Sequence, residues 1–239
     1  SRMFAITDSD FYYSGLEKPE AFDPDHFEPV DPENSQKNTG AISYNGILVI
    51  FKERSMYGLY GVGPSSWSIE LISPDMGCTS HRSIVAIDGV LYWWSHVGPV
   101  MWTGEGPPQQ IGQMFLRETL RNSVIDHGEF SNVVAAPVEE IEHLLFSVAD
   151  YGESRNGRTL VFNYRLGRFA SDGWTGIEPA SLAVVEDDAG RRYTYVGNYN
   201  GQIFRLWDTD TDGVPSGTVT GTFTPGTASI TTITSSGFY

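Results

Sequence analysis

The sequence predicts an all-β protein built as a β-propeller of about five blade modules, near the lower end of the roughly four to eight that propellers use. Short apolar or alternating runs recur along the chain, separated by Gly, Asn and Asp. The turns between these runs contain residue pairs that tolerate positive φ. These pairs are Asn45-Gly46, Asp88-Gly89, Asn156-Gly157, Asp172-Gly173 and Asn200-Gly201.

A repeat indicates the length of one blade. Gly46 opens a strand–turn–strand unit that closes at Gly61, and Gly89 opens a second unit that closes at Gly104. The opening glycines are 43 residues apart, and so are the closing glycines. A period of about 40 to 50 residues is typical of a four-stranded propeller blade.

Three other stretches read as strand, tight turn, strand, and bring the modules to about five. They are residues 3–13, 143–164 and 193–207. Only residues 113–124 have a pattern compatible with a short helix.

Composition divides the chain into two parts. Residues 1–213 form the propeller-like domain, and residues 214–239 are dominated by Thr, Ser and Gly. We interpret 214–239 as a strand that enters a further domain or closes the ring with residues 3–6, with a flexible linker as the alternative. The chain opens with Ser1 rather than methionine, and we interpret it as one piece of a longer protein.

Charge and apolar content exclude several partners. The 239 residues include 30 acidic and 15 basic side chains, a formal net charge of −15. This balance disfavours binding to phosphate backbones, which relies on Lys and Arg, and docking on anionic membranes. No apolar run approaches the roughly 20 residues that a membrane-spanning helix needs, so we expect no membrane insertion by this chain. A single cysteine excludes an internal disulfide.

Motifs for catalysis are missing, so we expect a non-enzyme without a cofactor. The five histidines show no metal-ligand spacing, and no nucleophile or phosphate-binding motif is present. Cys78 and His81 lie three residues apart. We interpret them as a packed cysteine and a surface histidine rather than a catalytic pair, because a thiolate needs positioning groups that the sequence does not indicate.

One acidic loop resembles a calcium-binding loop. Asp208, Asp210 and Asp212 precede Gly213, a spacing that places carboxylates around one cation. Position 12 of the loop is Val219, where an EF-hand needs a glutamate. We therefore favour an acidic β-turn, with bound calcium as the alternative.

Aromatic residues concentrate around Trp93, Trp94 and Trp102. Neighbouring residues of a strand face opposite sides, so Trp93 and Trp94 cannot share one core. Packing between blades, with one contact at an interface, is the first interpretation. The alternative is an aromatic platform at a blade surface, with Trp93 and Trp94 as the candidates and Trp94 or Trp102 at its centre, which stacks on sugar rings or on a partner protein.

Several short motifs resemble a block common in tailed-phage virion proteins, roughly "FKE-S-Y, GC-S-RS-V, DG-LYF". Here the block reads Phe51-Lys52-Glu53-Arg54-Ser55-Met56-Tyr57, Gly77-Cys78-Thr79-Ser80-His81-Arg82-Ser83-Ile84-Val85 and Asp88-Gly89-Val90-Leu91-Tyr92-Trp93. Motifs near the start and the end of the chain resemble the same family. Those near the start are Arg2-Met3-Phe4, Tyr12-Tyr13-Ser14-Gly15 and Pro19-Glu20-Ala21-Phe22. Those near the end are Gly201-Gln202-Ile203-Phe204-Arg205-Leu206 and Thr211-Asp212-Gly213-Val214-Pro215. Trp93 stands where the family has Phe, and the family's proteins are commonly much longer.

The resemblance implies a β-propeller tail protein of short-tailed phages, of the nozzle or tail-tube class. Such a protein is located in the virion tail and forms a homo-oligomeric ring, often a hexamer. The ring retains DNA and lets it pass without specific binding, and it contacts adaptor and fibre proteins. We expect these contacts in loops at blade edges, at Pro64, Trp67, Pro99, Trp102, Pro107 and Pro108. The alternative function is a carbohydrate- or receptor-binding propeller, or a glycan hydrolase, that uses the aromatic platform.

Overall fold

The computed structural model describes residues 2–112, 124–170, 174–175 and 177–206, and these form an all-β fold of five antiparallel sheets. The first two sheets contain β1 (Phe4–Ile6), β2 (Asp10–Gly15) and β3 (Lys18–Pro29), then β4 (Asn38–Tyr44), β5 (Ile47–Lys52), β6 (Met56–Tyr60) and β7 (Ser68–Ser73). The third contains β8 (Val85–Ile87), β9 (Val90–Ser95), β10 (Gly98–Trp102) and β11 (Gln109–Gln110).

The fourth sheet contains β12 (Val134–Val138), β13 (His143–Ala149), β14 (Asn156–Asn163), β15 (Arg168–Phe169) and β16 (Trp174–Thr175). The fifth contains β17 (Pro179–Glu186), β18 (Arg192–Asn198) and β19 (Ile203–Arg205). Short 3₁₀ turns connect some strands: η1 (Pro64–Ser66), η2 (His81–Ser83), η3 (His127–Asn132) and η4 (Glu139–Ile141). In the part of the chain that the structure describes, no helix has the length and apolarity to cross a membrane.

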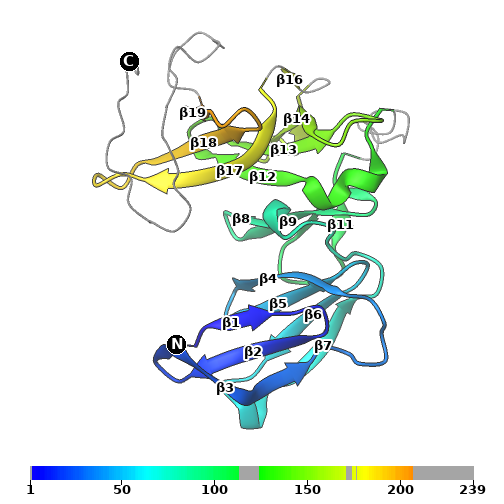
Figure 1. Ribbon diagram of the computed structural model, residues 1–239, viewed down its shortest axis with the longest axis vertical. Coiled ribbons are helices and arrows are strands. Elements are labelled where there is room, and N and C mark those ends of the chain that lie inside the picture. Colours follow the sequence, from blue (N-terminus) through cyan, green and yellow to red (C-terminus); the bar gives the residue numbers. More distant parts are fainter. Residues whose placement is uncertain (1, 113–123, 171–173, 176, 207–239) are drawn as a thin grey trace.

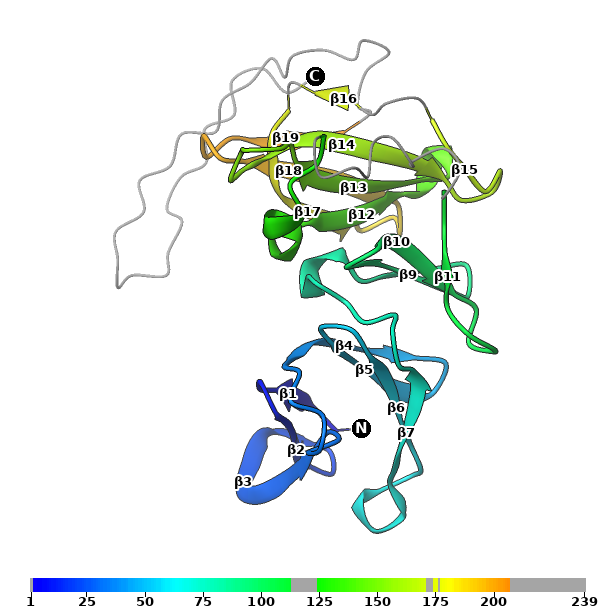
Figure 2. The same cartoon turned by 90° about the vertical axis from the view of Figure 1, so that its right-hand side faces the viewer.

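Each sheet is a meander of strands that are neighbours in the sequence, as in a propeller blade, except that β16 of the fourth sheet pairs with β14. In Figures 1 and 2 the sheets follow one another in chain order, so the first and the last lie at opposite ends of an open arc. The first strands of neighbouring sheets approach each other, as β1 does β4, β8 does β12 and β12 does β17. The fold is therefore propeller-like, with five blades.

The 43-residue repeat corresponds to the second and third sheets, each of four strands. Asn45 and Gly46, between β4 and β5, have φ of 47° and 81°, and Asp88 and Gly89, between β8 and β9, have φ of 48° and 75°. Two consecutive residues with positive φ are the signature of the type I′ turn, whose twist matches that of paired strands. The repeat expected from the sequence is confirmed.

The core consists of four clusters, one between each pair of consecutive sheets. β5 shows how one strand serves two clusters, because Ile50 faces the first sheet while Val49 and Phe51 face the third. A middle sheet is thus covered on both faces, and its strands read as continuous apolar runs. Among the described residues, no cluster joins the first sheet to the last.

The expected helix lies almost wholly outside the described residues, which omit 113–123, and so does segment 214–239. The three predicted hairpins are present: 3–13 contains β1 and most of β2, 143–164 contains β13 and β14, and 193–207 contains most of β18 and all of β19.

Candidate functional site

Residues 77–84, here called the hub segment, connect the second sheet to the third and include η2. They coincide with the middle of the motif block that resembles phage virion proteins. The hub segment contacts four of the five sheets directly, and each contact is described in turn.

Gly77 anchors the hub segment to the second sheet. A Cβ atom at this position would lie 2.3 Å from the Lys52 carbonyl oxygen and 2.4 Å from the Arg54 backbone nitrogen, so only glycine fits. The next residue, Cys78, donates its backbone N–H to the Lys52 carbonyl at 3.0 Å. The Trp93 indole Nε1 of the third sheet donates to the Gly77 carbonyl at 2.9 Å. Two sheets are therefore joined through one glycine.

Ser83 organises the turn that follows. Its hydroxyl donates to the Ser80 carbonyl at 2.7 Å and accepts the Trp94 backbone N–H at 3.0 Å. The Cys78 thiol donates to the same Ser80 carbonyl at 3.1 Å. Burial raises the pKa of Cys78 to about 12, so the thiol stays protonated and unreactive near neutral pH. Cys78 is buried and His81 is exposed, as expected for a packed cysteine and a surface histidine.

Three side chains of the hub segment reach distant blades. The Ser80 hydroxyl donates to the Val133 carbonyl at 2.7 Å, and the Thr79 hydroxyl donates to the Phe130 carbonyl at 3.3 Å. Arg82 Nη1 donates to the Ala180 carbonyl of β17 at 3.2 Å. Each donor satisfies a backbone carbonyl that precedes or belongs to a strand of the fourth or fifth sheet, which fixes these sheets relative to the third.

Lys52, also in the motif block, fixes the connection between the first and second sheets. Its side chain is buried, and Nζ donates to the carbonyls of Asp31, Asn34 and Gln36 at 3.2, 3.0 and 3.2 Å. Desolvation lowers the pKa of Lys52, partly opposed by the charges of Asp31 and Asp10. The ammonium thus satisfies three carbonyls of the linker between β3 and β4.

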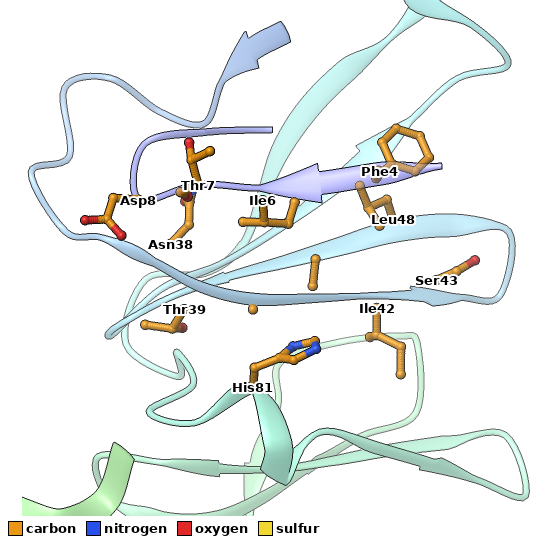
Figure 3. A pocket seen from close by; sticks show the side chains of 12 residues that line it. Phe4, Ile6, Thr7, Asp8, Asn38, Thr39, Ile42, Ser43, Leu48 and His81 are labelled. Atoms are coloured by element: carbon orange, nitrogen blue, oxygen red, sulfur yellow. The ribbon is translucent and has the colours of Figure 1, made fainter. Parts of the chain in front are cut away.

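A pocket of about 530 Å³ lies beside His81, between β1 and β4 (Figure 3). Its lining is mixed: Phe4, Ile6, Ala41, Ile42 and Leu48 are apolar, and Thr7, Asp8, Asn38, Thr39, Ser43 and His81 are polar. Gly40 also lines it, and a Cβ there would lie 2.8 Å from His81 Nδ1. The close approach of η2 to β4 therefore depends on a glycine.

The prediction of an aromatic platform as the alternative site is wrong. Trp93 and Trp94 are both fully buried, and Trp102 is buried as well. The two neighbours do face opposite sides, because Trp93 packs between the second and third sheets and Trp94 between the third and fourth. The third sheet is covered on both faces, so neither indole reaches a surface.

The candidate interface loops divide into two groups. Pro107 is exposed, and Pro64 and Trp67 are half-buried. Trp67 packs edge-on against Tyr13 with ring centroids 4.7 Å apart, which joins the second sheet to the first. Pro99, Trp102 and Pro108 are buried, so the expectation that they offer contact surfaces is wrong. The reason is that β10 lies in a middle sheet with both faces covered.

The acidic loop at Asp208, Asp210 and Asp212 lies outside the described residues. Within the described ranges, no group of three or more His, Cys, Asp and Glu side chains is placed to hold a metal ion.

Comparisons with known proteins show no family and a weak similarity to solved structures. No family model matches the chain, and no curated protein matches it significantly. Among solved structures, the chain is similar to the N-terminal domain of Nup159, with 10% sequence identity and a TM-score of 0.39. The match covers 84% of this chain and 71% of the other.

Proposed function

We propose that this chain is a non-enzymatic structural component of a phage tail, of the nozzle or tail-tube type. It forms part of a homo-oligomeric ring through which DNA is retained and then ejected. Its partners are other copies of itself and the adaptor and fibre proteins of the virion.

The observation that supports this proposal most directly is the role of the motif block. The residues that resemble the phage family also set the arrangement of the blades. Lys52 binds the linker between β3 and β4, Gly77 permits the hub segment to approach the second sheet closely, and Arg82 binds the fifth sheet. These residues determine how the blades are arranged, so the motif block specifies a framework rather than a reaction. A framework role fits a protein whose task is to hold a fixed shape within an assembly.

The charge of the chain is compatible with a conduit for DNA. A net charge of −15 repels phosphate backbones, so a duplex passes without being held by the wall. Tight, salt-sensitive binding of duplex DNA by the isolated protein would contradict this part of the proposal. A filter-binding titration at low and high salt measures it.

Localisation in the virion tests the function itself. An antibody against the chain, or a tagged chain expressed during infection, should label the tail in electron micrographs of particles from the source phage. Label on the capsid, or absence of the chain from purified particles, would overturn the proposal. Specific binding on a glycan array would favour the carbohydrate-binding alternative, although that alternative has lost the aromatic platform on which it was based.

A further inference from the structure

The fifth sheet presents an apolar outward face. Its inward side chains, such as Val196 and Phe204, are buried against the fourth sheet. The strand register places the alternate residues on the opposite face. These outward residues are Ala183, Val185, Tyr193, Tyr195 and Ile203, and we call them the tail face.

The tail face has the composition of a binding surface. Val185 and Ile203 are each 50% exposed. The guanidinium carbons of Arg205 and Arg191 lie 3.9 and 5.7 Å from the centre of the Tyr193 ring. Tyrosine and arginine are enriched among the residues that dominate binding energy in protein interfaces, and β-branched residues on both faces of a strand are typical of a sheet covered twice.

The first sheet also presents an outward face with aromatic residues. Phe4, Ile6 and Phe11 face the second sheet, so Ala5 and Tyr12 face outward. Tyr12 pairs with Phe27 of β3, with ring centroids 5.6 Å apart, and Phe27 is 44% exposed. We call Ala5, Tyr12 and Phe27 the head face.

The two faces differ in charge. β3, which carries Phe27, has four carboxylates and one lysine; the carboxylates belong to Glu20, Asp23, Asp25 and Glu28. The tail face is bordered by Arg205 and by the Arg191–Asp187 ion pair, with Arg191 Nη2 2.8 Å from Asp187 Oδ2. The acidic border of the head face is electrostatically complementary to the Arg205 guanidinium, whereas two head faces would bring two acidic borders together.

We propose that the tail face of one copy packs on the head face of a second copy, head to tail. The proposal extends an interface that the chain already makes four times, because consecutive sheets pack face to face through aromatic and aliphatic side chains. The first and fifth sheets are the two that have such a neighbour on one side only, as far as the described residues extend. A head-to-tail contact is heterologous, so it closes into a ring when the rotation per copy permits.

This inference rests on the ring-forming part of the proposed function, and two variants test it. Tyr195→Glu adds a carboxylate to the tail face, opposite the acidic head face. Phe27→Lys adds an ammonium to the head face, opposite the arginines. Val62→Glu is the control, because Val62 is fully exposed in the turn after β6 and belongs to neither face.

Analytical ultracentrifugation of the purified chain at about 50 µM detects an interface with a dissociation constant in the micromolar range. We expect wild type and Val62→Glu to associate, and each face variant alone to sediment as a monomer. An equimolar mixture of the two variants should associate, because the tail face of Phe27→Lys and the head face of Tyr195→Glu are both intact. Circular dichroism melting of each variant checks that the fold is preserved.

Other results overturn the proposal. A monomeric wild type excludes the interface at this affinity. If Phe27→Lys still forms dimers while Tyr195→Glu does not, two tail faces pair with each other and the head face is not involved. Neither result bears on the location of the chain in the virion tail, which labelling tests independently of how the isolated chain associates.

Discussion

The middle sheets and the end sheets of this molecule are built from similar strands but differ in what covers them. In the third sheet Leu91 and Trp93 face one neighbour while Tyr92 and Trp94 face the other, and all four are buried. In the fifth sheet Val196 of β18 is buried, while Val185 of the neighbouring strand β17, on the opposite face, is half exposed.

This difference assigns different tasks to the two regions. The middle sheets and the hub segment specify the arrangement of the blades, so their substitution acts on stability. The outward faces of the end sheets contribute little to the fold and are available for partners. The following predictions test that division, in order of decreasing expected effect.

The largest effect is expected for Gly77→Ala. The new methyl group would overlap the backbone of Lys52, the last residue of β5, and of Arg54 in the turn between β5 and β6. We expect a loss of at least about 3 kcal/mol in the free energy of unfolding, because a packed backbone cannot move aside. Urea unfolding followed by tryptophan fluorescence measures it.

Gly46→Ala is the matched control. Gly46 has φ of 81°, and a Cβ there meets no atom within 4 Å. The cost is then only that of a left-handed backbone, about 1 to 2 kcal/mol. Equal losses for the two variants would show that the hub segment has no special role.

Val196→Thr and Val185→Thr compare the two faces of the fifth sheet directly. Both changes replace a methyl by a hydroxyl, so shape is nearly constant. At Val196 the hydroxyl is buried against the fourth sheet, and we expect a loss of about 1 to 3 kcal/mol. At Val185 we expect a change within about 0.5 kcal/mol. A large loss at Val185 would mean that the tail face is already covered within one copy.

Trp93→Phe and Trp94→Phe compare the two faces of the third sheet. Both indoles are fully buried, but only the N–H of Trp93 has an acceptor among the described residues, the Gly77 carbonyl. Trp93→Phe leaves that carbonyl without its donor, whereas Trp94→Phe removes a donor that had no acceptor. We expect Trp93→Phe to be more destabilising by about 1 to 2 kcal/mol in thermal or urea unfolding. The reverse order would contradict the role assigned to Gly77.

The local parts of this fold could be predicted from the sequence. Asn45-Gly46 and Asp88-Gly89 select their turns through their own φ preferences, so these two hairpins and the 43-residue repeat were predictable. The predicted turn at Asn156-Gly157 is wrong, because both residues begin β14. The opposite orientations of Trp93 and Trp94 follow from strand geometry alone. Burial of both did not follow, because it depends on the second sheet and the fourth lying on either side of β9.

The hub contacts were beyond prediction for a related reason. Ser80 and Arg82 donate to backbone carbonyls 53 and 98 residues away, and a carbonyl acceptor leaves no trace in residue type. Lys52 belongs to the motif block, but nothing in the sequence distinguishes a lysine that donates to three backbone carbonyls from a lysine at the surface. The motif block could therefore be recognised in the sequence, but the contacts that its residues make between the sheets could not.

The smallest expected effect is a dependence of stability on pH that originates in the middle sheets. Burial, assisted by the charge of Arg54 and opposed by Asp75, lowers the pKa of His96 in the turn between β9 and β10. Burial also lowers the pKa of His143 at the start of β13, opposed by Glu142.

A lowered pKa in the folded state means that the unfolded chain takes up the proton first as the pH falls. The stabilisation is therefore complete above the unfolded histidine pKa of about 6.5 and is lost as the pH falls through it toward the lower folded value. Urea unfolding at about pH 7.5 and about pH 5.5 should give a smaller loss for His96→Gln than for wild type, and a smaller one still when His143→Gln is added. Identical losses in all three proteins would place the pH dependence in the carboxylates, many of which belong to the acidic first sheet, and would move this property from the middle of the molecule to its end.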